Sequence, residues 1–274
     1  MASPSEITIQ QLNRLIGTSA APMIIDARIE ADFNDDPRVI PSAIRHPHDA
    51  VETIVNVING RSVVVYCQKG HKISQGMTAL LKTHGVKAEY LQGGQMGWAE
   101  KNMPLVEWAK IPMNAKGHSL WVTRHRPKID RIACPWLIRR FVDSNAQFLF
   151  VAPAEVMDVA KMFKATPFDV EDVFWSHRDE FCTFDIMIKE FGLNIEALDE
   201  LATVIRGADT NKHELAPQAA GLLAFSVGMS RMFREDSEQL DKSMLFYDAL
   251  FRWARDGMDE SHDWVTSKGP TSKG

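Results

Sequence analysis

Cys67 is the residue whose surroundings best suit covalent chemistry. It directly follows the apolar run 62–66 and precedes Gln68-Lys69-Gly70-His71-Lys72, a basic loop with a glycine at its centre. Successive backbone N–H groups of such a loop, together with the N-terminus of a following helix, stabilise a thiolate and hold an anion above it. A small buried hydrophobic cysteine is the alternative. The positive charge of Lys69 and Lys72 favours the nucleophile.

A second group of residues, in the C-terminal half, has the chemistry of metal ligands. His177 and Cys182 lie five residues apart across a short loop that leads into a predicted helix, and Asp209 follows a glycine turn at the end of another. Imidazole, thiolate and carboxylate together bind Zn or Fe, and three protein ligands leave a coordination position open. A buried histidine with ordinary hydrogen bonds is the alternative.

Cys134 is the third thiol to consider. It precedes Pro135, and because proline fits a helix in its first turn, a helix that begins there would place this thiol at its positive end. A buried core cysteine is the alternative.

Basic residues are concentrated between positions 116 and 140. They are Lys116, Arg124, Arg126, Lys128, Arg131, Arg139 and Arg140, against the single acid Asp130. This cluster is a candidate site for an oxyanion. The alternatives are a solvated or interdomain basic face, or a salt bridge between Asp130 and Arg131.

The elements that position Cys67 follow an α/β pattern. Thr8–Gln11 has the capping-box pattern of a helix start. Apolar runs at Met23–Ile25 and Ser62–Tyr66 predict central parallel strands. After the second run, a helical pattern ends at His84-Gly85, before a strand at Ala88–Leu91. Cys67 therefore stands at the carboxyl end of a strand, where α/β sheets place their ligand sites.

The C-terminal half has mainly helical periodicity. Helices are predicted at 136–142, 183–191, 195–205, 217–233 and 238–254, and strands only at 148–151 and 173–175. Residues 108–120 are predicted to be a linker. We therefore expect domains at 1–107 and 121–256, followed by a flexible tail at 257–274.

Composition sets outer bounds on function. The chain has 274 residues, of which 45% are hydrophobic and 24% charged, which is typical of a two-domain globular protein. The net charge of −5 argues against general nucleic-acid binding. Neither a signal segment nor a run of about 20 apolar residues is visible, so we expect a cytoplasmic protein without a membrane span. Three widely spaced cysteines favour thiol chemistry over disulfides.

Residues 1–107 resemble a single-domain rhodanese. The matching stretches are Ile25–Arg28, Ile40–Ile44, Tyr66-Cys67 with its loop, Leu91–Gly94 and Gly97-Trp98. The resemblance implies a five-stranded parallel sheet flanked by helices, in which Cys67 cycles between thiol and persulfide and passes on sulfane sulfur. It also implies that Asp26 and Arg28 support the site.

The candidate loop departs from the family at two positions. Gln68 and Lys72 stand where active rhodaneses often have arginine, and lysine cannot make a bidentate contact with an oxyanion. Activity on thiosulfate itself is therefore in doubt. Ile73, which completes the candidate loop, stands where the related phosphatases place an arginine around a phosphate, which argues against phosphatase activity.

Residues 121–256 resemble the C-terminal domain of the chromate-resistance protein B family. The matching stretches are Trp121–Arg124, Asp130–Phe141, His177 with Cys182–Phe184, Arg206–Asp209 and Tyr247–Leu250. The resemblance implies an association with chromate resistance. In this domain Arg124, Asp130, Arg131, Cys134 and Asp209 are candidate site residues, beside the metal candidates His177 and Cys182.

The leading hypothesis is a rhodanese-type sulfurtransferase linked to chromate stress. Its partners would be a small anionic sulfur donor and a thiol or other nucleophile as acceptor, and a homo-oligomer is left open. The rhodanese chemistry requires no cofactor. The alternatives are a non-enzymatic sensor of chromate, another oxyanion or redox state, and a metal-dependent redox domain with Zn or Fe in the C-terminal half.

Overall fold

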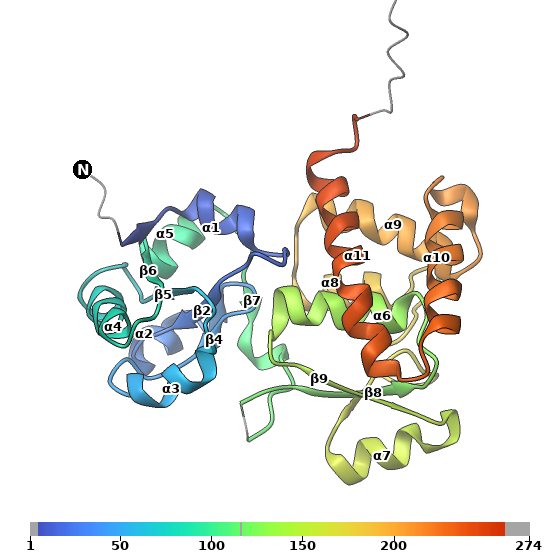
Figure 1. Cartoon of the computed structure of the whole chain (residues 1–274), viewed down its shortest axis with the longest axis horizontal. Helices are drawn as coiled ribbons and strands as arrows, with labels where there is room; N and C mark the ends of the chain where they lie inside the picture. Colours follow the sequence, from blue (N-terminus) through green and yellow to red (C-terminus); the bar gives the residue numbers. More distant parts are fainter. Residues whose placement is uncertain (1–4, 116, 261–274) are drawn as a thin grey trace, which may run out of the picture.

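The structure is a computed structural model that describes residues 5–115 and 117–260. The basic residue Lys116 and most of the predicted tail, residues 261–274, lie outside the described residues. Figure 1 shows two parts side by side, an α/β part formed by the first hundred residues and a larger, helix-rich part formed by the rest.

The N-terminal part is built on a five-stranded sheet in the order β1-β6-β5-β2-β4, with every neighbouring pair parallel. The strands are β1 (Glu6–Ile7), β2 (Met23–Asp26), β4 (Ile44–Arg45), β5 (Val63–Tyr66) and β6 (Ala88–Leu91). The helices are α1 (Ile9–Leu15), α2 (Glu30–Asp35), α3 (Val51–Ile58), α4 (Lys72–Thr83) and α5 (Gly94–Glu100). The predicted parallel sheet flanked by helices is confirmed.

The central strands are buried on both faces, as their continuous apolar runs predict. Alternate residues of β2 face opposite layers: Ile25 packs with α3 and α4, whereas Ile24 packs with α1 and α5. The predicted capping box starts α1, because Thr8 Oγ1 accepts from Gln11 N at 3.2 Å and Gln11 Oε1 accepts from Thr8 N at 2.9 Å.

The predicted linker has ordered structure. It is preceded by a two-stranded antiparallel ribbon, in which β3 (Arg38–Val39) pairs with β7 (Val106–Glu107). A 3-10 turn at Trp108–Lys110 follows, and Met113 and Ser119 form an isolated bridge. Ile111 and Ser119 are buried, so this connection packs against the body of the protein.

The C-terminal part is mainly helical, as predicted, around a three-stranded parallel sheet in the order β10-β8-β9. The strands are β8 (Leu120–Arg124), β9 (Gln147–Val151) and β10 (Thr166–Pro167). The helices are α6 (Asp130–Leu137), α7 (Val156–Phe163), α8 (Thr183–Phe191), α9 (Glu196–Asp209), α10 (Ala219–Met232) and α11 (Asp236–Asp256), with 3-10 turns at Pro153–Glu155 and His213–Leu215. Among the described helices, none is both long and apolar enough to cross a bilayer.

Several features of this part differ from the sequence prediction, among them helix α7, which was not expected. Strands β8 and β10 were not expected. The predicted strand at 173–175 contributes only one bridge, between Trp175 and Phe168. The apolar side chains of the predicted strand serve as packing groups instead: the Trp175 ring stacks on Phe191 with centroids 4.6 Å apart.

The predicted helix start at Pro135 is wrong. Helix α6 begins five residues earlier, at Asp130, and Pro135 lies inside it. Proline removes one backbone hydrogen bond there, and α6 passes into a π-helical turn at Ile138–Val142. Cys134 is consequently inside the helix and fully buried, not at a positive helix end.

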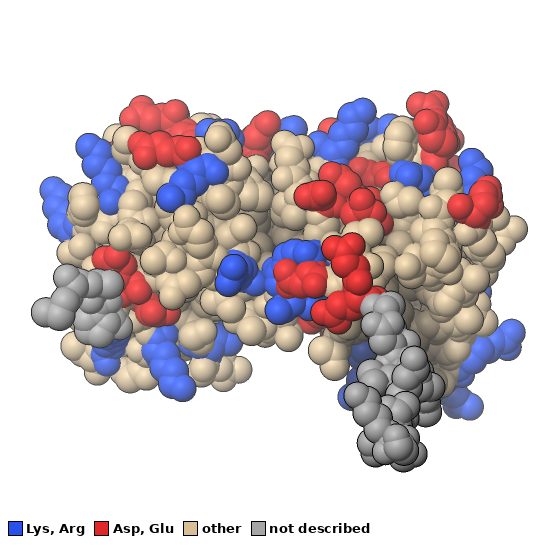
Figure 2. Space-filling view, turned by 90° about the horizontal axis from the view of Figure 1, so that it is seen from above, with Lys and Arg blue, Asp and Glu red and all other residues tan. Residues whose placement is uncertain are grey.

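The two parts share one hydrophobic core. A continuous cluster of buried side chains includes Leu12 and Trp98 from the first part and Trp136 and Phe141 from the second. The backbone N–H of Ser42 donates to the Phe141 carbonyl at 2.9 Å across the boundary. On the face seen in Figure 2, basic and acidic side chains are interspersed, in keeping with the small net charge.

Candidate functional site

Cys67 lies at the base of a pocket at the carboxyl end of β5. The pocket has a volume of about 940 Å³, within the usual range of small-molecule sites. Cys67 is 5% exposed. The polar lining consists of Asp32, His48, Gln68, Lys69, His71 and Lys72, and the apolar lining includes Ile29, Ile73, Met77 and Leu80. The predicted nucleophile thus faces a cavity with both basic and apolar walls.

The Cys67 loop contacts the rest of the described chain through its backbone carbonyls more than through its N–H groups. Within the described chain, no hydrogen-bond acceptor is found for the backbone N–H of residues 68–71, and the first N–H groups of α4 have no partner within the helix. The loop carbonyls are used instead: Cys67 O accepts from Gln95 N at 2.9 Å, and Gln68 O accepts from Met96 N at 3.0 Å. These contacts fix the loop to the start of α5.

Gly94 allows this close contact between α5 and the loop. Its φ is +57°, and a Cβ added there would lie 2.2 Å from the Cys67 carbonyl oxygen and 2.5 Å from Gly70 N. Gly70 itself has a φ of +72°, which agrees with the tight curvature expected at the centre of the loop. The backbone around Cys67 is therefore shaped by two glycines from separate segments.

Ser74 is a site residue that the sequence analysis missed. Its Oγ lies 3.2 Å from Cys67 Sγ and also donates to the His71 carbonyl at 3.2 Å. The residue stands in the first turn of α4 and is fully buried. A serine in the first turn after the Cys loop was the available signal, because that turn packs directly over the sulfur.

The remaining residues of the predicted loop fall into two groups. Gln68, Lys69 and His71 belong to the loop itself, and the Gln68 Oε1 atom is buried without a donor among the described residues. Lys72 and Ile73 already form the start of α4. All five line the pocket.

Asp26 and Arg28 form a buried ion pair beside the loop. Arg28 Nη2 lies 2.6 Å from Asp26 Oδ2, and both side chains are fully buried. The guanidinium also donates to the carbonyls of Asp36 and Arg38, at 2.8 Å each. Neither residue lines the Cys67 pocket. Their contacts instead hold the end of β2 to the adjacent segment at residues 36–38.

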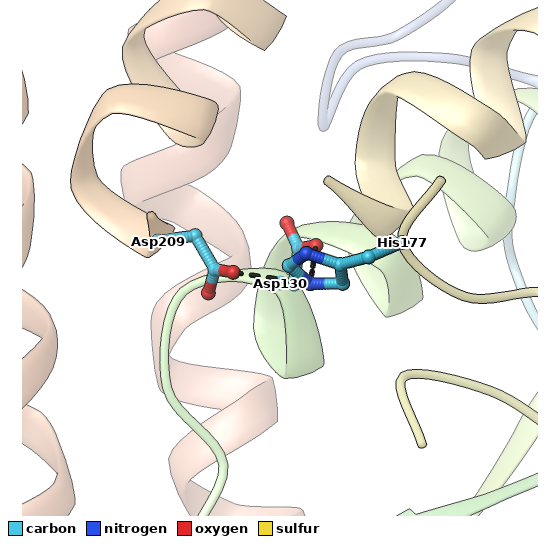
Figure 3. Close-up of side chains that lie close together, drawn as sticks. All are labelled: Asp130, His177 and Asp209. Carbon is cyan, nitrogen blue, oxygen red and sulfur yellow. Dashed lines mark ion pairs between the residues drawn. The ribbon is translucent and has the colours of Figure 1, made fainter. Parts of the chain in front are cut away.

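A second cluster forms in the C-terminal part around His177. Figure 3 shows its imidazole pointing toward Asp130 and Asp209, with a dashed line to each. The Nε2 atom is 3.2 Å from Asp209 Oδ2, 3.3 Å from Asp169 Oδ1 and 3.5 Å from Asp130 Oδ2. Asp130 begins α6 and Asp209 ends α9. Side chains from three stretches of the chain, at 130, 169–177 and 209, thus meet at one ring nitrogen.

Hydrogen bonds and burial set the charges in this cluster. Hydrogen bonds to Asp169 and Asp209 raise the pKa of His177 to about 10. Burial and the nearby negative charges of Asp209 and Asp169 raise the pKa of Asp130 well above its ordinary value. Burial alone would raise the pKa of Asp169, but hydrogen bonds from His177 and Thr183 outweigh it and lower that pKa.

Cys182 does not meet His177 as a predicted metal partner would. The groups close enough to share an ion are Asp130, His177 and Asp209, and Cys182 Sγ instead donates to Asp130 Oδ1 at 3.3 Å. Burial raises the pKa of the Cys182 thiol well above its ordinary value. Burial has the same effect on the pKa of Cys134.

The basic cluster of residues 116–140 pairs largely with acids from distant parts of the chain. Arg124 and Arg131 both contact Asp169 Oδ2 at 3.3 Å. The other pairs are Arg139 with Asp241 and Arg140 with Asp248, while the Arg126 side chain donates to the Ser230 carbonyl. The alternative of a salt bridge between Asp130 and Arg131 is not found, because Arg131 pairs with Asp169 instead.

Comparisons with known families confirm both resemblances. Residues 8–101 match the family model of the rhodanese-like domain, and residues 121–254 match the family model described as ChrB, C-terminal domain. Protein ChrB of Cupriavidus metallidurans is 31% identical over 133 residues, which cover 48% of this chain and 39% of that protein. The chain therefore spans about two fifths of the length of this curated relative.

Several solved structures are similar to the N-terminal part. A rhodanese-related protein from Thermoplasma volcanium is 20% identical, with a TM-score of 0.32, and the match covers 37% of this chain and 96% of that one. A rhodanese-like domain protein from Staphylococcus aureus is 24% identical, with a TM-score of 0.31, and the match covers 34% of this chain and 90% of that one. A protein of unknown function from Rhodopseudomonas palustris, described as a possible tyrosine phosphatase, is 19% identical, with a TM-score of 0.34, and covers 37% and 83%.

Proposed function

We propose that this protein is a rhodanese-type sulfurtransferase in which Cys67 carries sulfane sulfur as a persulfide. The observation that carries the proposal is the position of Cys67 at the base of a basic pocket, beside loop N–H groups without acceptors among the described residues. Such groups stabilise a thiolate and the anionic end of a persulfide. The match to the rhodanese-like family model supports it.

In the first step the Cys67 thiolate attacks the outer sulfur of the donor. A bond forms between Cys67 Sγ and that sulfur, the donor's own bond to the sulfur breaks, and the electron pair leaves with the rest of the donor. With thiosulfate the leaving group is sulfite. Lys69 and Lys72, both at the pocket, would stabilise its negative charge.

In the second step an acceptor takes the outer sulfur. A thiolate attacks that sulfur and forms a new sulfur–sulfur bond, and the electron pair of the broken bond returns to Cys67 as a thiolate. No net oxidation of the enzyme occurs over the two steps. Ser74 Oγ lies 3.2 Å from Cys67 Sγ. Its single hydroxyl hydrogen, which bonds the His71 carbonyl in this structure, would turn to the thiolate at the start and the end of the cycle.

The pocket suits a donor larger than thiosulfate. Ile29, Met77 and Leu80 give the pocket an apolar lining beside that of the lysines, and the volume of about 940 Å³ exceeds the needs of a five-atom anion. Gln68 and Lys72, which replace arginines, weaken bidentate binding of a small oxyanion. We therefore propose an organic persulfide or thiosulfonate as a better donor, and a cellular role associated with chromate resistance from the match to ChrB.

The test is the intact mass of the protein after incubation with thiosulfate or an organic thiosulfonate. The wild type should gain one sulfur atom, about 32 Da, and Cys67→Ser should gain none. The matched control is Cys134→Ser, which changes a buried thiol outside the pocket and should keep the gain. Circular dichroism establishes that both variants are folded. A wild type that gains no sulfur from either donor, or a Cys67→Ser variant that gains it, would refute the proposal.

A further inference from the structure

The cluster around His177 has donor separations that match a shared metal ion. Two donor atoms that each lie about 2.1 Å from one ion are about 3.0 Å apart at a right angle and about 3.4 Å apart at a tetrahedral angle. His177 Nε2 lies 3.2 Å from Asp209 Oδ2 and 3.5 Å from Asp130 Oδ2. One ligand atom from each of the three residues falls within 4.8 Å of the others.

The charges of the cluster also suit a divalent cation. Asp169 is already paired with two cations, because Arg124 and Arg131 both contact its Oδ2 atom. Asp130 and Asp209 have no such arginine or lysine partner among the described residues. The Asp130 side chain is fully buried. Two carboxylates with a neutral imidazole balance a charge of +2.

Hydrogen bonds from neighbouring groups hold the ligands in place. Asp130 Oδ2 accepts from Thr183 N at 2.6 Å, and its Oδ1 accepts from Cys182 Sγ at 3.3 Å. Asp169 Oδ1 accepts from Thr183 Oγ1 at 2.9 Å, which orients a further carboxylate toward His177. Such outer contacts are typical of metal centres, where they fix ligand direction.

We propose that Asp130, His177 and Asp209 bind a divalent transition-metal cation of the Mn²⁺, Fe²⁺ or Zn²⁺ class. One imidazole and two carboxylates favour these ions over Mg²⁺, which prefers oxygen ligands throughout. Three protein ligands leave coordination positions for water or a small ligand. The His177 side chain is 40% exposed, so those positions open toward solvent.

The site differs from the one that the sequence indicated. Cys182 is replaced by Asp130 in the ligand set, and the thiol acts as a donor to that carboxylate. The alternative occupant is a proton: an imidazolium at His177 would itself be the cation of a pure ion-pair network. The two possibilities make opposite predictions for metal binding.

The experiment is a Mn²⁺ titration of the full chain, without an affinity tag and freed of metal by a chelator that is then removed. Electron paramagnetic resonance measures free Mn²⁺, whose six-line signal weakens when the ion binds. We expect one equivalent to bind per chain, Zn²⁺ to displace it, and Mg²⁺ at the same concentration to leave it in place. Asp209→Asn and His177→Gln should each weaken binding at least tenfold.

Matched controls lie outside the cluster. Asp241→Asn removes an exposed carboxylate and His84→Gln an exposed imidazole, and neither should change Mn²⁺ affinity. Absence of binding by the wild type at millimolar Mn²⁺ would overturn the proposal in favour of the ion-pair network, whether or not the variants fold. Equal affinity in wild type, Asp209→Asn and His177→Gln, or competition by Mg²⁺ as strong as by Zn²⁺, would also overturn it.

Discussion

Gly94→Ala tests whether the contact between α5 and the Cys67 loop determines the shape of the site. The added Cβ would lie 2.2 Å from the Cys67 carbonyl oxygen and 2.5 Å from Gly70 N. Both are backbone atoms, so no flexible side chain can move aside. The loop or the helix must shift by roughly 1 Å to restore an ordinary contact.

The expected loss of stability is the sum of two contributions. A non-glycine residue at the φ of +57° costs about 1 kcal/mol, and forcing an extra carbon into a packed region costs about 1–3 kcal/mol. The total is about 2–4 kcal/mol. A displacement of about 1 Å at a reacting group lowers a rate by about 100-fold, so sulfur transfer should fall by that order.

Gly85→Ala is the matched control. Gly85 also has a positive φ, +76°, but a Cβ there would meet nothing within 4 Å. This variant should lose only about 1 kcal/mol and keep its sulfur-transfer rate. Urea unfolding measures the stabilities, and the rate of persulfide formation measures the function. If Gly94→Ala were as stable as Gly85→Ala within about 0.5 kcal/mol and fully active, the loop contact would not have the role assigned to it.

Two other substitutions probe the supports of the loop. Ser74→Ala should slow the reaction of Cys67 with iodoacetamide about tenfold, because it removes a hydroxyl that can donate to the thiolate. Asp26→Asn should lower the free energy of unfolding by about 3 kcal/mol, because it leaves the guanidinium of Arg28 buried beside a neutral amide. Urea unfolding measures the loss of stability in Asp26→Asn. Both variants retain Cys67 itself.

Each of these has a control of the same chemistry. Thr83→Ala removes a hydroxyl at the exposed end of α4, where it bonds to the Leu80 carbonyl. An equal rate in Ser74→Ala and Thr83→Ala would contradict the first prediction. Asp36→Asn breaks a more exposed pair with Arg38 and should cost less than about 1 kcal/mol. If Asp26→Asn lowered the free energy of unfolding as little as Asp36→Asn does, the buried pair of Asp26 and Arg28 would contribute little to stability.

The Cys67 pocket was predictable because its features are contiguous in sequence. A buried strand, a cysteine, a basic loop and a helix follow one another between 62 and 83, and local rules for strand ends and helix starts place them correctly. Gly94 was recognised only within the matching stretch Leu91–Gly94, since its contact with the loop depends on how α5 packs. Ser74 was missed for another reason: its place in the first turn after the loop was available from the sequence, but no hydroxyl there was considered as a partner for Cys67.

The His177 cluster could be predicted only in part. His177, Asp130 and Asp209 were each named as candidates, but nothing in the local pattern indicates that their side chains meet. Asp169 was not considered at all, because the two-residue strand β10 before it carries almost no periodic signal. The ion pairs of the arginines between 124 and 140 could not be predicted either, since their acidic partners lie up to 108 residues away in the sequence.

The position of Pro135 shows tertiary packing overriding a local preference. Trp136, the next residue, packs against the rings of Phe141, Phe184, Tyr247 and Phe251 and donates to Asp248 at 2.9 Å. This burial outweighs the hydrogen bond that proline removes from α6. A rule for helix starts takes no account of such contacts, so it placed the start five residues too late.

The hydrophobic core shared by the two parts links their stabilities. Because Leu12 and Trp98 lie in the same cluster as Trp136 and Phe141, cutting the chain between the parts would bare apolar surface on both fragments. Each part therefore contributes to the packing of the other. A substitution where the two parts meet should therefore affect both the Cys67 pocket and the His177 cluster, because one cooperative unfolding transition would include both.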